Sequence, residues 1–170
     1  MQGRDVILGL LCERDHTGYG IKEMIETQLQ YFFDGTSGMI YPTLKKLEKE
    51  GKVTKQTVVQ LDRPNKNVYS ITPAGREDFM RYLSSEVDEE IIKSDFLMRL
   101  YFDENFKESR VRSLIEEELA RKKVQLEKLG KNITDWQKNG MSEGQSLAYR
   151  YGRAYYEAMG AMLEKFLEEM

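Results

Sequence analysis

The chain has 170 residues, which suits one compact domain or a small domain with a helical extension. Hydrophobic residues make up 40% and charged residues 32%, and no apolar stretch approaches the roughly 20 residues that a membrane-spanning helix needs. Cys12 is the one cysteine, which excludes a disulfide within the chain, and residues 1–13 lack a signal-peptide pattern. We therefore expect a cytoplasmic protein with no membrane partner.

The net charge is −3, but the charge is unevenly distributed. Residues 38–76 hold eight basic and three acidic side chains, so this segment carries +5 and the rest of the chain −8. A basic block in an acidic chain is typical of a phosphate-binding face. A lysine-rich surface helix would give the same pattern, so charge alone leaves both interpretations open.

Two helices are predicted at the N-terminal end. Residues 4–14 carry the amphipathic pattern of the first, with apolar positions at Val6, Ile7, Leu10 and Leu11. The segment 15–18 breaks that pattern. A second helix is predicted over residues 19–30, with Ile21, Met24, Ile25 and Leu29 facing inward.

A third helix is predicted over residues 38–50, after a turn cluster at 34–38 in which Ser37 is the expected N-cap. Gly51 stands where a left-handed C-cap residue belongs. At about 100° per residue, one face of this helix is apolar and the other is basic. The apolar face holds Ile40, Leu44 and Leu47; the opposite face holds Pro42, Lys45, Lys46 and Lys49, with Tyr41 on the flank.

A β-hairpin follows, with strands predicted over residues 53–61 and 68–71 and a basic turn at 62–67. Thr72 is the expected cap of the next helix, with Pro73 at its first position. Tyr69 is expected to be a packed strand residue, while Tyr19 fits the core or the surface. The order helix, helix, turn, helix, hairpin, helix is that of a winged helix-turn-helix domain.

From residue 73 the pattern is helical to the end of the chain, with an expected extension to residue 92 and a cap at Ser94. A heptad stripe then runs through Ile115, Leu119, Lys122, Leu126, Leu129, Ile133 and Trp136. A turn is expected at Asn139 and Gly140. One side of the last helix holds Leu147, Tyr151, Tyr155, Met159, Met162, Phe166 and Met170.

Two long amphipathic helices leave apolar surface over after they pair with each other, so a symmetric homodimer is predicted. Its interface is expected to be formed by Ile115, Leu119, Leu126, Leu129, Ile133, Tyr155, Met159 and Phe166. The aromatic residues near this interface predict either a pocket for a flat effector, lined by Trp136, Tyr151 and Tyr155, or plain helix packing.

Three motifs carry a family resemblance. The first is Gly18-Tyr19-Gly20-Ile21, which opens the second helix. The second is residues 38–51, where Tyr41-Pro42 is followed by spaced leucines, Glu48 and the closing Gly51. The third is Arg63 with residues 68–75. Together they resemble the PadR family of transcription regulators, and the long C-terminal helices resemble its longer-tailed subgroup, related to the phenolic-acid regulators.

The resemblance implies a dimer whose recognition helices and wings meet the two half-sites of a palindromic double-stranded DNA operator. It also implies repression of nearby genes, often relieved by a small molecule, so a small aromatic or drug-like effector is a further candidate partner. The physical chemistry of the segment agrees, because a recognition helix places its N-terminal residues against base edges and cations release counterions from phosphates. The DNA-binding residues predicted on these grounds are Thr36, Ser37, Tyr41, Thr43, Lys45, Lys46, Lys49, Arg63, Asn65 and Lys66.

Other chemistry finds little support. His16 is the one histidine and has no cysteine or carboxylate cluster at metal-ligand spacing, so we expect no metal and no cofactor. No nucleophile–base constellation or phosphate loop occurs, so we do not expect an enzyme.

We predict a mainly α protein with a small β-hairpin: a winged helix-turn-helix domain over residues 1–82 and a helical dimerisation region over residues 83–170, which is also the candidate effector-sensing region. The alternatives are a repressor controlled by its abundance without a ligand, and a winged helix that serves as a scaffold for other proteins.

Overall fold

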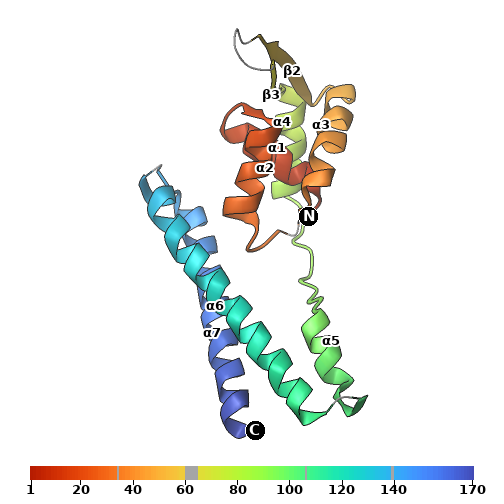
Figure 1. Cartoon of the computed structure of the whole chain (residues 1–170). Coiled ribbons are helices and arrows are strands. Elements are labelled where there is room, and N and C mark those ends of the chain that lie inside the picture. Colours follow the sequence, from red (N-terminus) through yellow and green to blue (C-terminus); the bar gives the residue numbers. More distant parts are fainter. Residues whose placement is uncertain (34, 60–64, 106, 139) are drawn as a thin grey trace. The chain divides into compact units, whose positions relative to one another are not determined.

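The computed structural model describes residues 1–33, 35–59, 65–105, 107–138 and 140–170 (Figure 1). It divides into two compact units, Met1–Glu89 and Glu90–Met170. The division predicted after residue 82 lies close to the end of the last helix of the first unit, α4 (Pro73–Leu83).

The first unit is built on helices α1 (Gly3–Glu13), α2 (Gly18–Met24), α3 (Ile40–Lys49) and α4. Helix α1 packs against α3 and α4, and α2 packs against α3 (Figure 1). The predicted helices thus exist, and their apolar faces meet in one core. That core holds Ile7, Leu8, Leu10, Leu11, Ile21, Ile25, Ile40, Leu44, Leu47, Val53 and Tyr69.

The second predicted helix changes its winding before it ends. After α2, Ile25–Leu29 forms a π-helical turn, η1. The Thr27 hydroxyl donates a hydrogen bond to the Glu23 carbonyl oxygen at 2.7 Å, and this competes with the regular backbone bonding of an α-helix. This hydrogen bond coincides with the wider turn.

The sheet has three antiparallel strands in the order β1 (His16–Thr17), β3 (Lys66–Ile71), β2 (Val53–Val58). His16 lies opposite Tyr69, and Lys66 lies opposite Val58. Strand β1 falls where we predicted only a break between helices, because two residues are too short to show an alternating pattern. The predicted turn is wrong at its end, since Lys66 and Asn67 belong to β3.

The ends of α3 and α4 follow the predicted capping chemistry. Gly51 has φ of +69°, and the amides of Gly51 and Lys52 donate to the carbonyl oxygens of Glu48 and Leu47. Thr72 Oγ1 accepts from the Gly75 amide at 3.1 Å and donates to the Gly51 carbonyl oxygen at 2.8 Å. The C-cap of one helix and the N-cap of the next are therefore joined directly.

Two of our predictions about helix ends are wrong. Ser37 does not cap α3; it opens a 3₁₀ turn, η2 (Ser37–Met39), that precedes the helix. Helix α4 ends at Leu83 instead of reaching residue 92. The Ser84 and Ser85 hydroxyls donate to the carbonyl oxygens of Met80 and Tyr82, and the acidic run 86–90 would repel the negative end of a longer helix.

The second unit contains α5 (Asp95–Tyr101), a 3₁₀ turn η3 (Asp103–Asn105), α6 (Glu108–Lys138) and α7 (Glu143–Glu169). Helices α6 and α7 lie side by side as an antiparallel hairpin (Figure 1). Ser94 caps α5 as predicted, and Ser142 and Gln145 form a capping box on α7. Gly140 has φ of +84°, in agreement with the predicted turn, whereas Asn139 lies outside the described residues.

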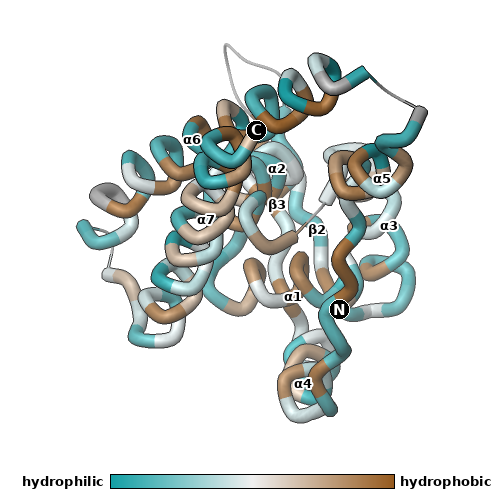
Figure 2. The backbone as a smooth tube through the Cα atoms, turned by 90° about the horizontal axis from the view of Figure 1, so that it is seen from below, coloured by the Kyte–Doolittle hydropathy of each residue, from teal (hydrophilic) through white to brown (hydrophobic). Residues whose placement is uncertain are grey.

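Apolar and polar residues alternate along both long helices (Figure 2). The residues buried between them include Leu114, Ile115, Leu129, Tyr149, Tyr156 and Leu163. The heptad stripe of α6 therefore packs first against this chain's own α7.

Candidate nucleic-acid interface

The outer face of α3 is exposed, as the sequence predicts. Ile40, Leu44 and Leu47 are buried beneath it. Lys45, Lys46 and Lys49 are exposed on the opposite side, and the Tyr41 side chain is 60% exposed on the flank. A helix with this face toward solvent can enter a groove without disturbing its own domain.

Ion pairs divide the lysines of the basic segment into two groups. Lys52 Nζ lies 3.1 Å from Asp78, and Lys55 Nζ lies 3.4 Å from Glu48, so these two charges are used inside the domain. Lys46 has a longer contact of 4.0 Å with Glu50. Within the residues that the structure describes, Lys45 and Lys49 have no ion-pair partner, so their charge is available to an anion.

Ionic contacts hold the C-terminal end of α3 in place. Arg4 of α1 lies 3.4 Å from Glu50 and 3.1 Å from Asp78 of α4. The Asp78 carboxylate also forms ion pairs with the ammonium of Lys52, at 3.1 Å, and with the guanidinium of Arg81, at 3.3 Å. The hydrogen bond from Lys52 and the charges around it lower the pKa of Asp78, a carboxylate whose side chain is 14% exposed. This cluster connects α1, α3, the start of β2 and α4.

Tyr41 crosses from α3 to the start of α2. Gly18 is buried there, and a Cβ atom at Gly18 would lie 2.6 Å from Cε1 of Tyr41. Tyr69 is buried as predicted, and burial raises the pKa of its phenol. Tyr19, for which the sequence left two interpretations, is 70% exposed. Tyr19 is an additional exposed aromatic residue at the N-terminal end of α2, which the sequence did not assign to the interface.

The predicted polar contacts near the start of α3 do not all lie on one face. Thr36 and Ser37 are exposed in and beside η2, next to the outer face. Thr43 is half-buried and lines a hollow of about 230 Å³ with Gln2, Arg4 and Met39 of the same domain. Its hydroxyl therefore lies on the flank opposite Tyr41.

The β2–β3 hairpin, which is the wing of this fold, contributes an exposed lysine. Lys66 opens β3 and has no ion-pair partner among the described residues, and Asn65 is exposed just before it. A hydrogen bond of 2.9 Å from Thr57 Oγ1 to Asn67 Oδ1 joins the two strands nearby. Arg63, also predicted to contact DNA, lies outside the described residues.

His16 belongs to no cluster of potential metal ligands among the residues that the structure describes. His16 is buried in β1, and burial is the main cause that lowers its pKa. No group of three or more potential ligands comes together in the described part of the chain. None of the helices there is both long and apolar enough to cross a membrane.

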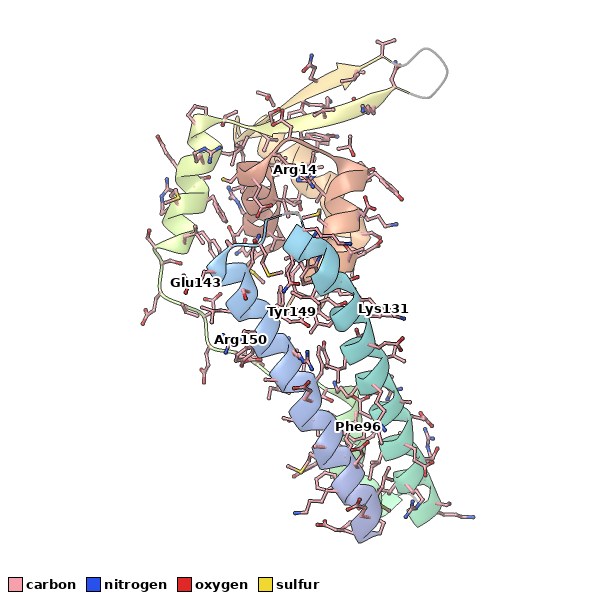
Figure 3. All side chains as sticks on the ribbon, turned by 90° about the vertical axis from the view of Figure 1, so that its left-hand side faces the viewer. Arg14, Phe96, Lys131, Glu143, Tyr149 and Arg150 are labelled. Carbon is pink, nitrogen blue, oxygen red and sulfur yellow. The ribbon has the colours of Figure 1, made fainter. Side chains whose placement is uncertain are left out.

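The predicted effector residues come from both long helices: Trp136 belongs to α6, and Tyr151 and Tyr155 belong to α7. The Trp136 ring packs edge-to-face on the Tyr149 ring, with ring centroids 6.2 Å apart. Figure 3 shows the position of Tyr149 on α7. Tyr149 is buried toward α6, whereas Tyr151 and Tyr155, one turn apart, are exposed. The described contacts thus place Trp136 on the buried side of α7, while the rings of Tyr151 and Tyr155 are exposed on another side.

The predicted dimer residues also divide by burial. Ile115 and Leu129 are buried inside the hairpin, and Leu119, Leu126, Ile133 and Met159 are half-buried. Tyr155 and Phe166 are exposed and belong to what we term the open stripe of α7: Leu147, Tyr151, Tyr155, Met162, Phe166 and Met170. The polar heptad residue Lys122 lies 3.0 Å from Glu118, and its ammonium lies 5.7 Å from the ring centroids of both Tyr155 and Tyr156.

Comparison with known proteins gives matches for both units. Residues 7–81 match the model of the Transcriptional regulator PadR-like family, and residues 92–170 match that of the Virulence activator alpha C-term. The chain is 29% identical over 124 residues to the Negative transcriptional regulator PadR of Bacillus subtilis, spanning 72% of this chain and 68% of that protein.

Solved structures are similar along the whole chain. The protein smu.1604c of Streptococcus mutans is 46% identical with a TM-score of 0.93, covering 99% of each chain. The PadR-like transcriptional regulator BC1756 of Bacillus cereus is 39% identical with a TM-score of 0.89, covering 99% of this chain and 97% of that one. Bacillus subtilis PadR, solved in complex with operator DNA, is 26% identical with a TM-score of 0.82, covering 98% and 97%.

Proposed function

The chain belongs to the PadR-like family of transcriptional regulators, and on this basis we propose that it binds an operator in double-stranded DNA as a homodimer and represses transcription. The observation that carries the proposal is the outer face of α3, where exposed Lys45 and Lys49 have no internal ion pair in the described part of the domain. The structure of Bacillus subtilis PadR with operator DNA supports it. We also propose that the protein acts in the cytoplasm, where the DNA of bacteria such as Bacillus subtilis lies.

In the proposed complex α3 enters the major groove, with Tyr41 and Lys45 directed to base edges. Lys46 and Lys49 neutralise phosphates, and Thr36 and Ser37 donate hydrogen bonds to phosphate oxygens.

The wing reaches the DNA backbone or the minor groove through Arg63, Asn65 and Lys66. Thr43 belongs to this surface only if the DNA extends over the flank where α3 meets α1.

The open stripe of α7 supports the proposed homodimer. Helix α7 buries Tyr149, Gly152, Tyr156 and Leu163 against α6, yet it carries a second apolar line on another side. Exposed apolar surface of this length is typical of an interface. A two-fold dimer through it would present two copies of α3, and a palindromic operator needs them about 34–36 Å apart.

A small aromatic acid is the effector class that we propose. Bacillus subtilis PadR has been solved in complex with p-coumaric acid, and that chain is 25% identical to this one with a TM-score of 0.74, covering 98% of this chain and 96% of that one. A ligand that prefers one spacing of the recognition helices would lower operator affinity by a population shift. Tyr151 and Tyr155 are the exposed aromatic candidates; Trp136, already packed on Tyr149, would act through that contact.

The test is a gel shift of the full-length protein with the DNA upstream of its own gene, at about 50 mM and about 200 mM salt, with random DNA as competitor. Binding that survives the competitor and weakens steeply with salt is the expected result. A folded dimer with no preference for any sequence, including those selected from a random library, would instead favour a winged helix that binds other proteins.

A further inference from the structure

Gly18 opens α2, yet its backbone conformation does not require glycine. Among the described residues, the glycines with positive φ are Gly51 and Gly140, so Gly18 has a conformation open to any residue. Glycine is also a poor helix former. The reason for glycine at this position must therefore lie in what surrounds it.

The space at Gly18 is filled by the ring of Tyr41. A Cβ atom there would lie 2.6 Å from Cε1, 3.0 Å from Cζ and 3.2 Å from the hydroxyl oxygen of Tyr41. Carbon atoms in proteins pack at about 3.5–4.0 Å, so no side chain fits while the ring stays where it is. Tyr41 thus rests on the bare backbone of α2.

The same ring is mostly open to solvent. Tyr41 belongs to the first turn of α3 and is 60% exposed, although its edge touches buried Gly18. A long side chain at a helix surface ordinarily samples several rotamers. Contact with the neighbouring helix limits that freedom and gives the exposed part of the ring a defined direction.

We propose that Gly18 is a positioning residue for DNA recognition: the missing side chain lets Tyr41 lie across α2 and sets the direction in which its hydroxyl meets DNA. This inference rests on the proposed function and deepens it, because Gly18 touches no DNA itself and acts only through Tyr41.

The substitution Gly18→Ala separates this role from a structural one. The atoms that it displaces are the far end of an exposed side chain, so the ring turns away while the fold persists, and alanine favours the helix. Gly20→Ala is the matched control in the same helix. A Cβ atom at Gly20 would lie 3.4 Å from His16 Nδ1 and Thr17 Oγ1, which needs at most a small adjustment.

The experiment is a double-mutant cycle on the full-length protein, measured by fluorescence anisotropy with the operator found by the gel shift and with random DNA. Gly18→Ala and Tyr41→Ala are each expected to weaken operator binding about tenfold, the discrimination of one good base contact. Gly18→Ala is expected to add less than about twofold in the Tyr41→Ala background, and Gly20→Ala to change nothing.

A second readout follows the ring in the free protein. In NMR spectra, Gly18→Ala is expected to shift the ring resonances of Tyr41, while Gly20→Ala leaves them in place. Unchanged ring resonances, or operator binding by Gly18→Ala equal to that of Gly20→Ala, would overturn the inference alone. A wild-type protein that does not prefer operator to random DNA would overturn the proposed function, and the role of Gly18 in recognition with it.

Discussion

At the scale of single residues, the lysines of residues 45–55 have different roles, although the sequence pattern does not distinguish them. Lys52 and Lys55 are held by Asp78 and Glu48, whereas Lys45 and Lys49 face solvent without a partner among the described residues. A lysine already paired inside the domain gains little from a phosphate, because it would have to leave its carboxylate. Only the unpaired lysines are expected to set the salt dependence of DNA binding.

Lys45→Ala is therefore expected to weaken binding and to reduce the slope of log affinity against log salt by about one unit per half-site. Lys55→Ala is its control, since Lys55 lies nearby but pairs with Glu48 at 3.4 Å. Its loss should leave the slope unchanged. Anisotropy titrations at several salt concentrations measure both, and equal slopes for the two variants would contradict this division of the lysines.

The sequence predicts the candidate site well in one respect and poorly in another. The 3.6-residue period places Lys45 and Lys49 on the outer face of α3 and Tyr41 on its flank, and the structure confirms that all three are exposed. The period does not reveal which lysine has a carboxylate within reach, because Asp78 is distant in sequence. For the same reason the contact between Tyr41 and Gly18 could not be predicted.

At the scale of elements, Asp78 links α4 to α1 and to Lys52, the residue before β2, and Arg4 extends this cluster to the end of α3. Its carboxylate receives Arg4, Lys52 and Arg81 at 3.1–3.3 Å, and Arg4 also reaches Glu50 at the end of α3. An ion pair that is largely shielded from water contributes more than an exposed one, because solvent screens it less. Asp78 thus helps to fix the recognition helix against the rest of the domain.

Asp78→Asn is expected to lower the free energy of unfolding by about 2 kcal/mol at pH 7. The pKa of Asp78 is lowered in the folded state, so its contribution is complete above the ordinary carboxyl range of about 4 and is lost as pH falls through the lower folded value. Urea unfolding at pH 7 and at successively lower pH measures this. The difference between wild type and variant should shrink toward acid; a constant difference would assign the loss to packing.

Helices with strong periodicity and caps could be predicted from sequence, and weakly specified segments could not. Thr72 and Gly51 mark helix ends through their own local chemistry, so both predictions are confirmed. Strand β1 is defined by its pairing with β3, a contact between distant parts of the chain that a local sequence pattern does not reveal. The helix predicted beyond Leu83 rests only on scattered apolar residues, and the negative charges at 86–90 oppose a longer helix.

At the scale of the whole molecule, the heptad stripe that predicted a dimer serves first to pair α6 with α7. Leu129 is fully buried within that hairpin. A second surface, the open stripe of α7, is left for another molecule. Substitutions in the two stripes should therefore have different effects, which separates folding of the hairpin from assembly.

Phe166→Asp is expected to give folded monomers, since Phe166 lies on the open stripe at 37% exposure. Leu129→Asp should instead unfold the second unit, because a carboxylate would be buried without a partner. Sedimentation gives the mass, and circular dichroism gives the helix content. A dimeric Phe166→Asp protein with full helix content would contradict the proposed interface.

The open stripe of α7 also affects the cellular concentration at which the protein is stable. If two copies cover it, the association free energy is part of the stability of each copy, and the melting temperature rises with concentration. A chain made at low copy number would then spend more time as an exposed monomer, open to proteases. Such a regulator would be silenced by dilution, as in a rapidly growing cell, before any ligand reached it.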